Sequence, residues 1–213
     1  MLVAIPVFDA FTALDAIGPY EVLQRLPDAE VRFVGHRTGE VRTENGFLGL
    51  TVDATFAEVT SPDVVIVPGG IGTRALLGSG SPILDWLREV HPGTRFTTSV
   101  CTGALVLAAA GLLDGLSATT HWASYEELRA LGAEPTGQRV VEHLDRRIIT
   151  AAGVSSGIDM ALRLAELLVD ADAAKAMQLM VEYDPQPPFD AGSLDKAGDA
   201  VVARVVEYAA DKD

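Results

Sequence analysis

The sequence is poor in cysteine and in basic residues. Its 213 residues include one cysteine, Cys101, and 16 Lys and Arg against 30 Asp and Glu, which gives a formal net charge of −14. One cysteine cannot form a disulfide within the chain, and no cluster of Cys and His has the spacing of a zinc site. The acidic balance argues against nucleic acid or an anionic membrane as a partner, because phosphate contacts require clustered basic side chains.

Long apolar runs and targeting signals are also missing. No apolar stretch approaches the roughly 18 residues of a membrane span. The N-terminal sequence MLVAIPVFDAF has no basic segment, and Pro6 and Asp9 interrupt its apolar run. It is therefore interpreted as a first strand and not as a signal peptide. A cytoplasmic protein is expected.

What the sequence does contain is an ordinary globular composition, with 48% hydrophobic and 22% charged residues, in which strand-like and helix-like segments alternate. Strands are predicted at 2–8, 30–36, 63–70, 95–100 and 146–153, and helices at 18–26, 81–90, 102–113, 121–132, 156–170, 171–183 and 195–210. Hairpins are predicted over 42–55, around Asn45-Gly46, and near 139–150. This order predicts one α/β domain over residues 1–213, a flavodoxin-like and mostly parallel sheet with helices on both faces.

The stretch SVCTGA (99–104) places Cys101 between the end of a predicted strand and the start of a predicted helix. Ligands collect at the carboxyl ends of parallel strands, and a residue between strand and helix is the arrangement of a nucleophile elbow. The positive end of the following helix is expected to lower the pKa of the thiol. From this chemistry alone, a reactive thiol and an inert buried cysteine are about equally compatible with the sequence.

A second predicted strand ends in VPGGIGT (67–73), whose glycines let the backbone approach a ligand closely. Backbone N–H groups of this segment, at Gly70 and Ile71, and of Thr102 could form an oxyanion-type site. A plain turn between strand and helix is the alternative. The segment is not a P-loop, because the Lys-Ser/Thr ending is missing.

Five segments, taken in order, resemble the ThiJ/PfpI superfamily, whose members have a class I glutamine amidotransferase-like fold. They are PVFDAFTALDAIGPYEVL, VPGGIGT, SVCTGALVLAAAGLL, ATTHW and GVSSGID. LDAIGPYEVL together with VCTGALVL, and the tail EYDPQPPFDAGS (182–193), are similar to the branch of the superfamily that hydrates isocyanides. The resemblance covers essentially the whole chain, although VCTGA and TTHW also occur in the ligand-sensing domains of related transcription regulators.

The resemblance implies roles for particular residues. Cys101 matches the nucleophile, and Asp15 takes the place of the acid that hydrogen-bonds it, which is Glu in most of the superfamily. Without the resemblance, the alternative is that Asp15 is an acidic residue near a helix start, where it caps the helix or interacts with its dipole. Thr102, which we group with Cys101 and Asp15 as a catalytic residue, stands where protease-like and amidase-like relatives carry His, and this departure argues against proteolysis.

Other residues are expected to line the pocket beside the thiol. They are His121, for which a structural core histidine is the alternative, and the pair Gly153-Val154 at the end of another predicted strand.

The implied activity is a carbon–nitrogen hydro-lyase reaction on a small molecule, without metal or organic cofactor. An isocyanide would become an N-substituted formamide through a thioimidate on Cys101, with Asp15 moving the proton. A homodimer is expected, and residues 184–193 could cross its interface or pack on their own subunit. The rivals are a glyoxalase- or deglycase-type enzyme that uses His121, and a ligand or redox sensor in which Cys101 is oxidised.

Overall fold

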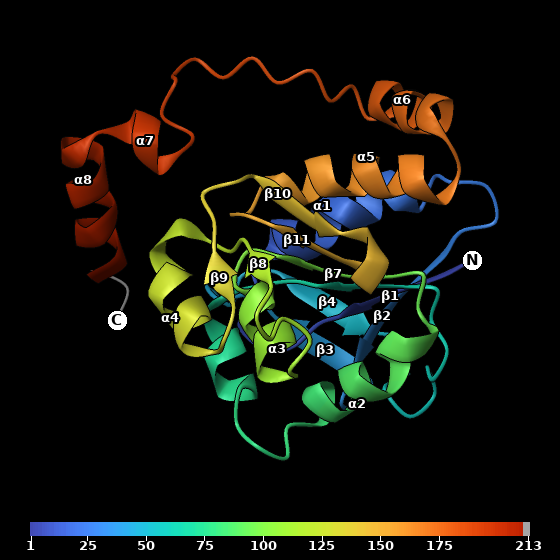
Figure 1. The fold of residues 1–213 in the computed structure, drawn as a ribbon. Coiled ribbons are helices and arrows are strands. Elements are labelled where there is room, and N and C mark those ends of the chain that lie inside the picture. Colours follow the sequence, from blue (N-terminus) through green and yellow to red (C-terminus); the bar gives the residue numbers. More distant parts are fainter. Residues whose placement is uncertain (211–213) are drawn as a thin grey trace. The chain divides into compact units, whose positions relative to one another are not determined.

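One twisted sheet with helices on both faces organises the structure, a computed structural model that describes residues 1–210 (Figure 1). Seven strands join in the order β10-β11-β7-β6-β1-β2-β5, and all neighbours are parallel except β10 and β11. These strands are β1 (Leu2–Pro6), β2 (Glu30–Gly35), β5 (Ala54–Thr55), β6 (Val64–Val67), β7 (Phe96–Val100), β10 (Val140–His143) and β11 (Ile148–Ala151). The α/β class predicted from the sequence is confirmed.

Two further strand pairs lie outside this sheet. The antiparallel hairpin of β3 (Gly39–Arg42) and β4 (Gly49–Val52) matches the hairpin predicted around Asn45-Gly46, with a six-residue loop at 43–48. A short parallel pair, β8 (Ser117–Ala118) and β9 (Glu134–Pro135), was not predicted. The second predicted hairpin is formed by β10 and β11.

Helices cover both faces of the sheet, and no helix among the described residues has the length and apolarity to cross a membrane. In Figure 1, α1 and α5 lie together on one side, and α2 and α3 lie on the other. The α-helices are α1 (Ala13–Leu23), α2 (Pro82–Val90), α3 (Gly103–Ala109), α4 (Tyr125–Ala130), α5 (Ser156–Leu168), α6 (Ala171–Met180), α7 (Leu194–Ala197) and α8 (Asp199–Ala210). Short 3-10 helices are η1 (Ile71–Leu76), η2 (His91–Gly93), η3 (Trp122–Ser124) and η4 (Leu144–Arg146).

Alternate residues of the central strands supply the two cores. Along β6, Val65 and Val67 pack into the layer under α2 and α3, whereas Val64 and Ile66 pack into the layer under α1 and α5. All four valine and isoleucine side chains are fully buried. A strand buried on both faces needs apolar residues at every position, which is why these segments have no polar alternation.

The first helix begins earlier than predicted. A start near Gly18 with Pro19 in the first turn was expected, but α1 begins at Ala13 and contains Pro19 inside it. Hydrogen bonds to other segments fix the chain just before Ala13: the Ala10 N–H donates to the Arg42 carbonyl (2.7 Å), and the Thr12 N–H donates to the Gly69 carbonyl (2.8 Å). These long-range contacts, and not the proline, set the start of the helix.

Glycines with positive φ shorten two other predicted helices. The helix predicted over 102–113 ends at Ala109, because Gly111 has φ of 80° and ends it in the usual left-handed conformation. The helix predicted over 195–210 is divided at Gly198, where φ is 72°. The segment 121–132 folds as η3 followed by α4.

The chain groups into two compact units by its internal contacts, Met1–Val181 and the segment from Glu182 onward; one domain over residues 1–213 stays a prediction. The first unit contains the whole sheet and α1 to α6. The second contains the Pro-rich segment 184–193, α7 and α8, and its side chains are mostly exposed. All the residues considered for a functional site belong to the first unit.

Candidate functional site

Cys101 occupies a strained turn between β7 and α3. Its φ of 56° is in the left-handed region that residues with a side chain seldom adopt. The backbone is held there because the Cys101 N–H donates to the carbonyls of Ala151 (3.1 Å) and Ala152 (2.8 Å), and the Thr120 hydroxyl donates to the Cys101 carbonyl (2.9 Å). This is the strand–turn–helix geometry of a nucleophile elbow, as predicted.

A glycine is required directly after the elbow. A Cβ atom added at Gly103 would lie 2.1 Å from the carbonyl oxygen of Val67, at the end of the neighbouring strand β6. No side chain can be accommodated there without moving the strand or the helix. The close approach of α3 to β6 therefore depends on residue 103 having no side chain.

Asp15 reaches the same place from the first turn of α1. Its side chain is fully buried, the Gly69 N–H donates to its Oδ2 atom (2.9 Å), its Oδ1 atom has no hydrogen-bond partner among the described residues, and the Cys101 thiol is close enough to act on its pKa. The loop after β6 must come close for this contact, since a Cβ at Gly69 would lie 2.9 Å from Oδ2 and 2.5 Å from the Thr102 nitrogen. The structure thus joins two residues that are far apart in the sequence.

Burial raises the pKa of both members of this pair. Loss of hydration raises the pKa of Asp15 to about 7, and the hydrogen bond from Gly69 and the nearby Cys101 thiol oppose that rise without cancelling it. Loss of hydration and the Asp15 carboxylate raise the pKa of the Cys101 thiol to about 12. The lowered thiol pKa expected from the helix start is wrong, because desolvation outweighs the N–H groups there.

Two backbone N–H groups face the sulfur of Cys101. They belong to Thr102 and Val154, and both act to lower the pKa of the thiol by favouring its charged form. Val154 follows β11, so the strand next to β7 supplies one donor and the start of α3 supplies the other. A negative charge that develops on sulfur during a reaction would meet these donors.

The Thr102 hydroxyl binds the Gly-rich loop. Its Oγ1 accepts a hydrogen bond from the Gly70 N–H (2.8 Å) and donates to the Gly70 carbonyl (3.1 Å). The Gly70 N–H is thus already engaged, whereas the Ile71 N–H makes no hydrogen bond within residues 1–210. Of the two loop donors considered from the sequence, the structure leaves that of Ile71 available, at the exposed start of η1.

His121 lies beside Gly153, at the edge of the site. Its ring carbon Cδ2 would be 3.0 Å from a Cβ at Gly153, and its Nδ1 accepts from the Ala123 N–H (3.3 Å). Burial and the nearby Arg74 guanidinium lower the pKa of the imidazole, and the Glu44 carboxylate acts in the opposite direction. The neutral form of the imidazole is favoured, and the hydrogen bond from the Ala123 N–H holds the ring.

Sequence reasoning missed three residues of the site. Gly69 donates to Asp15, Thr120 fixes the elbow, and Glu44 acts electrostatically on both Asp15 and His121. The glycine and the threonine stood inside the quoted segments VPGGIGT and ATTHW, but nothing local distinguished them. Glu44 gave no signal, because it comes from the loop of the β3–β4 hairpin.

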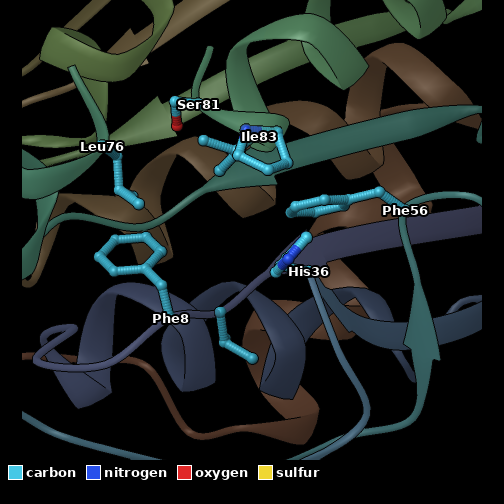
Figure 2. A pocket seen from close by; sticks show the side chains of 8 residues that line it. Phe8, His36, Phe56, Leu76, Ser81 and Ile83 are labelled. Carbon is cyan, nitrogen blue, oxygen red and sulfur yellow. The ribbon is translucent and has the colours of Figure 1, made fainter. Parts of the chain in front are cut away.

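A small apolar pocket lies elsewhere, at the carboxyl ends of β1, β2 and β5. Its space of about 300 Å³ includes open solvent, and Figure 2 shows Phe8 and Leu76 facing Phe56 and His36 across it. Cys101 and Asp15 do not line it. In the part of the chain that the structure describes, no three His, Cys, Asp or Glu side chains gather to form a metal site.

Fold and site together define an α/β protein with a buried cysteine at an elbow and a carboxyl group beside it. The chain belongs to the DJ-1/PfpI family, whose sequence pattern matches residues 1–167. That range includes every site residue described above and ends within the first compact unit.

Individual relatives agree with this assignment. An isonitrile hydratase of Pseudomonas putida is 45% identical over 203 residues, covering 95% of this chain and 87% of the relative. The crystal structure of a ThiJ/PfpI family protein from Pseudomonas syringae superposes with a TM-score of 0.91 at 37% identity, covering 99% of this chain and 86% of that one. Drosophila melanogaster DJ-1beta has the same fold, with a TM-score of 0.75 at 23% identity over 85% of this chain and 97% of its own.

Proposed function

We propose that this protein is an isocyanide hydratase that converts isocyanides into N-substituted formamides, with Cys101 as the nucleophile. The observation that carries the proposal is the buried pair of Cys101 and Asp15 at the elbow. The 45% identity with an isonitrile hydratase supports the same substrate class. The geometry supplies what an isocyanide needs, since its terminal carbon accepts a soft nucleophile and then takes up a proton.

The first half of the reaction adds the thiol across the terminal carbon. The Asp15 carboxylate takes the proton from the thiol while sulfur forms a bond to that carbon, and the Thr102 and Val154 N–H groups stabilise the charge on sulfur. Asp15 then delivers the proton to the same carbon. The product is a thioimidate in which carbon is bonded to hydrogen, to sulfur and, through a double bond, to nitrogen.

The second half consumes one water molecule. The Asp15 carboxylate removes a proton from the water as its oxygen attacks the thioimidate carbon, and Asp15 passes this proton to the substrate nitrogen, so that the remaining proton of the added hydroxyl is the one that returns to sulfur. The carbon–sulfur bond then breaks, the carbonyl of the formamide forms, and the thiol recovers its proton. The steps balance with isocyanide and water alone, so they require no cofactor.

The pKa values of Asp15 and Cys101 suit these proton transfers. An acid with a pKa of about 7 can both accept and release a proton near neutral pH, which is the condition for efficient general acid–base catalysis. A thiol with a pKa of about 12 remains protonated until Asp15 removes its proton during attack. We assign Thr102 mainly to positioning, because Gly70 engages its hydroxyl on both sides.

The test is turnover of an aryl isocyanide by the purified protein, followed as formamide production. We expect Cys101→Ala to abolish turnover and Asp15→Ala to reduce kcat by about 100-fold or more, the usual contribution of a general acid–base group. No turnover by folded wild-type protein with any of a panel of aryl and alkyl isocyanides would contradict the proposal. Full activity of Asp15→Ala would remove the proton-transfer role and leave the nucleophile in place.

Methylglyoxal and hydrogen peroxide provide the controls for the two rival functions. Turnover of methylglyoxal without turnover of isocyanides would favour a glyoxalase-type enzyme, and in that case His121→Ala would also be inactive. Rapid, selective oxidation of Cys101 would favour a redox sensor. We expect neither, because a thiol kept protonated by its surroundings reacts slowly with peroxide.

A further inference from the structure

Glu44 comes from the loop of the β3–β4 hairpin and contacts the segment that leads into α1. Its Oε2 accepts a hydrogen bond from the Thr12 hydroxyl (3.1 Å), and its N–H donates to the Phe11 carbonyl (3.2 Å). Both partners belong to the segment that leads into α1. The position of Glu44 is therefore fixed with respect to the helix that carries Asp15.

Two hydrogen-bonded connections join Glu44 to the reacting pair. Thr12, which binds the Glu44 carboxylate, accepts from the Asp15 N–H at its carbonyl (3.2 Å). The Thr12 N–H donates to the Gly69 carbonyl (2.8 Å), and the Gly69 N–H donates to Asp15 Oδ2 (2.9 Å). The carboxylate of Glu44 is thus connected to Asp15 through Thr12 alone and also through Thr12 and Gly69.

We propose that Glu44 is a positioning residue of this site: its carboxylate, held by the Thr12 hydroxyl at the start of α1, places a fixed negative charge near Asp15 and so tunes Asp15 as the base toward the Cys101 thiol. The inference rests on the proposed function for its catalytic meaning. A negative charge nearby disfavours a second negative charge on Asp15, and it adds to the effect of burial.

The other charged groups around Asp15 do not replace Glu44. The Gly-rich loop between β6 and η1 has no ionisable side chain, and the elbow contributes only the Cys101 thiol. On the helices packed against α1, charged side chains are engaged in ion pairs of their own: Asp159 with Arg139, Arg163 with Glu142 and Glu166, and Lys175 with Asp172. Glu44, by contrast, is hydrogen-bonded to Thr12 at the start of the helix that carries Asp15.

The test is the variant Glu44→Gln, which removes the charge and keeps an oxygen that can accept from Thr12. Its matched control is Glu40→Gln, which makes the same change of net charge on the same hairpin, at an exposed residue paired with Arg42. The first readout is the rate at which iodoacetamide alkylates Cys101 as a function of pH. Because Cys101 is the only cysteine of the chain, the rate reports on this site alone.

We expect the alkylation rate of wild-type protein to rise through a midpoint near pH 7, because an ionised Asp15 can take the proton of the thiol. In Glu44→Gln the midpoint should lie lower by about half a pH unit, and in Glu40→Gln it should not move. Because Glu44 is exposed, added salt should bring the wild-type midpoint toward that of Glu44→Gln and leave the variant unchanged. A purely structural role for Glu44 would not produce this dependence on salt.

Coincident alkylation curves for wild type and Glu44→Gln at low salt would overturn the inference. The pH dependence of kcat/KM with an aryl isocyanide, measured on the same variants, separates this failure from that of the proposed function. Turnover with coincident curves would leave the hydratase standing without Glu44. If the alkylation midpoint shifts but no isocyanide is turned over, the proposed hydratase function is contradicted, whereas the effect of Glu44 on Asp15 is supported.

Discussion

At the scale of single residues, the site works through a proton shared by two buried groups. Many reactive thiols are activated by a lowered pKa, but here the surroundings of Cys101 raise it. The thiol therefore depends on Asp15 to remove its proton when the substrate is present. This dependence explains why an acid is kept in the core beside the only thiol of the chain, although burial disfavours its charge.

The raised pKa of Asp15 predicts how stability varies with pH. The ordinary pKa of an aspartate side chain, 3.8, applies to the unfolded chain, and the pKa of Asp15 in the folded protein is about 7. Between about pH 4 and 7 the folded protein therefore keeps a proton that the unfolded chain releases. The free energy of unfolding should fall as pH rises through this window, by a few kcal/mol at most (on the order of 1.4 kcal/mol per pH unit). Urea denaturation of wild type and Asp15→Asn measures this, because the variant should lack the fall.

A control for this experiment is Asp145→Asn, which removes an exposed carboxylate from η4. Its unfolding free energy should follow that of wild type at every pH. Parallel curves for wild type and Asp15→Asn would show that burial does not raise the pKa of this carboxyl group.

At the scale of elements, the site is made where three parallel strands end. The chain after β1 supplies Asp15, the loop after β6 supplies Gly69 and Gly70, and the turn after β7 supplies Cys101. β6 is hydrogen-bonded to both β1 and β7, so these three ends meet at one edge. The strand order reverses between β1 and β6, and this switch point is where open α/β sheets place their ligands.

Close contact between α3 and β6 predicts a large effect of one methyl group. We expect Gly103→Ala to reduce the free energy of unfolding by about 2–4 kcal/mol, because the added carbon would overlap the Val67 carbonyl. Chemical denaturation measures the difference. Gly78→Ala is the control, since a Cβ there meets no atom within 4 Å, and it should be nearly neutral. An equally stable Gly103→Ala would contradict the close approach.

At the scale of the whole molecule, we propose that the chain is a single functional domain that acts as a homodimer. Large exposed apolar side chains at the end of α6, Leu179 and Met180, and in the following segment, Phe189, support an association of subunits. The net charge of −14 disfavours association through other surfaces, because like charges on two molecules repel each other.

Light scattering coupled to size exclusion tests the homodimer. We expect a mass of about 45 kDa, twice the 22.5 kDa of one chain. The dimer should persist at high salt, because apolar contacts are not weakened by screening. A mass of one chain at micromolar concentration would contradict the proposal.

The α/β class, the five central strands, both hairpins and the place of Cys101 at an elbow could all be predicted from the sequence, because apolar runs, glycines and helix starts are local signals. Only the tertiary structure decided the start of α1, which hydrogen bonds to Arg42 and Gly69 fix, and the pKa of Cys101, which depends on burial as well as on neighbours. The tertiary structure also joined Glu44 to Thr12, at the start of the helix that carries Asp15. Contacts between distant segments carry no local pattern, and the loss of hydration depends on everything that packs around a group.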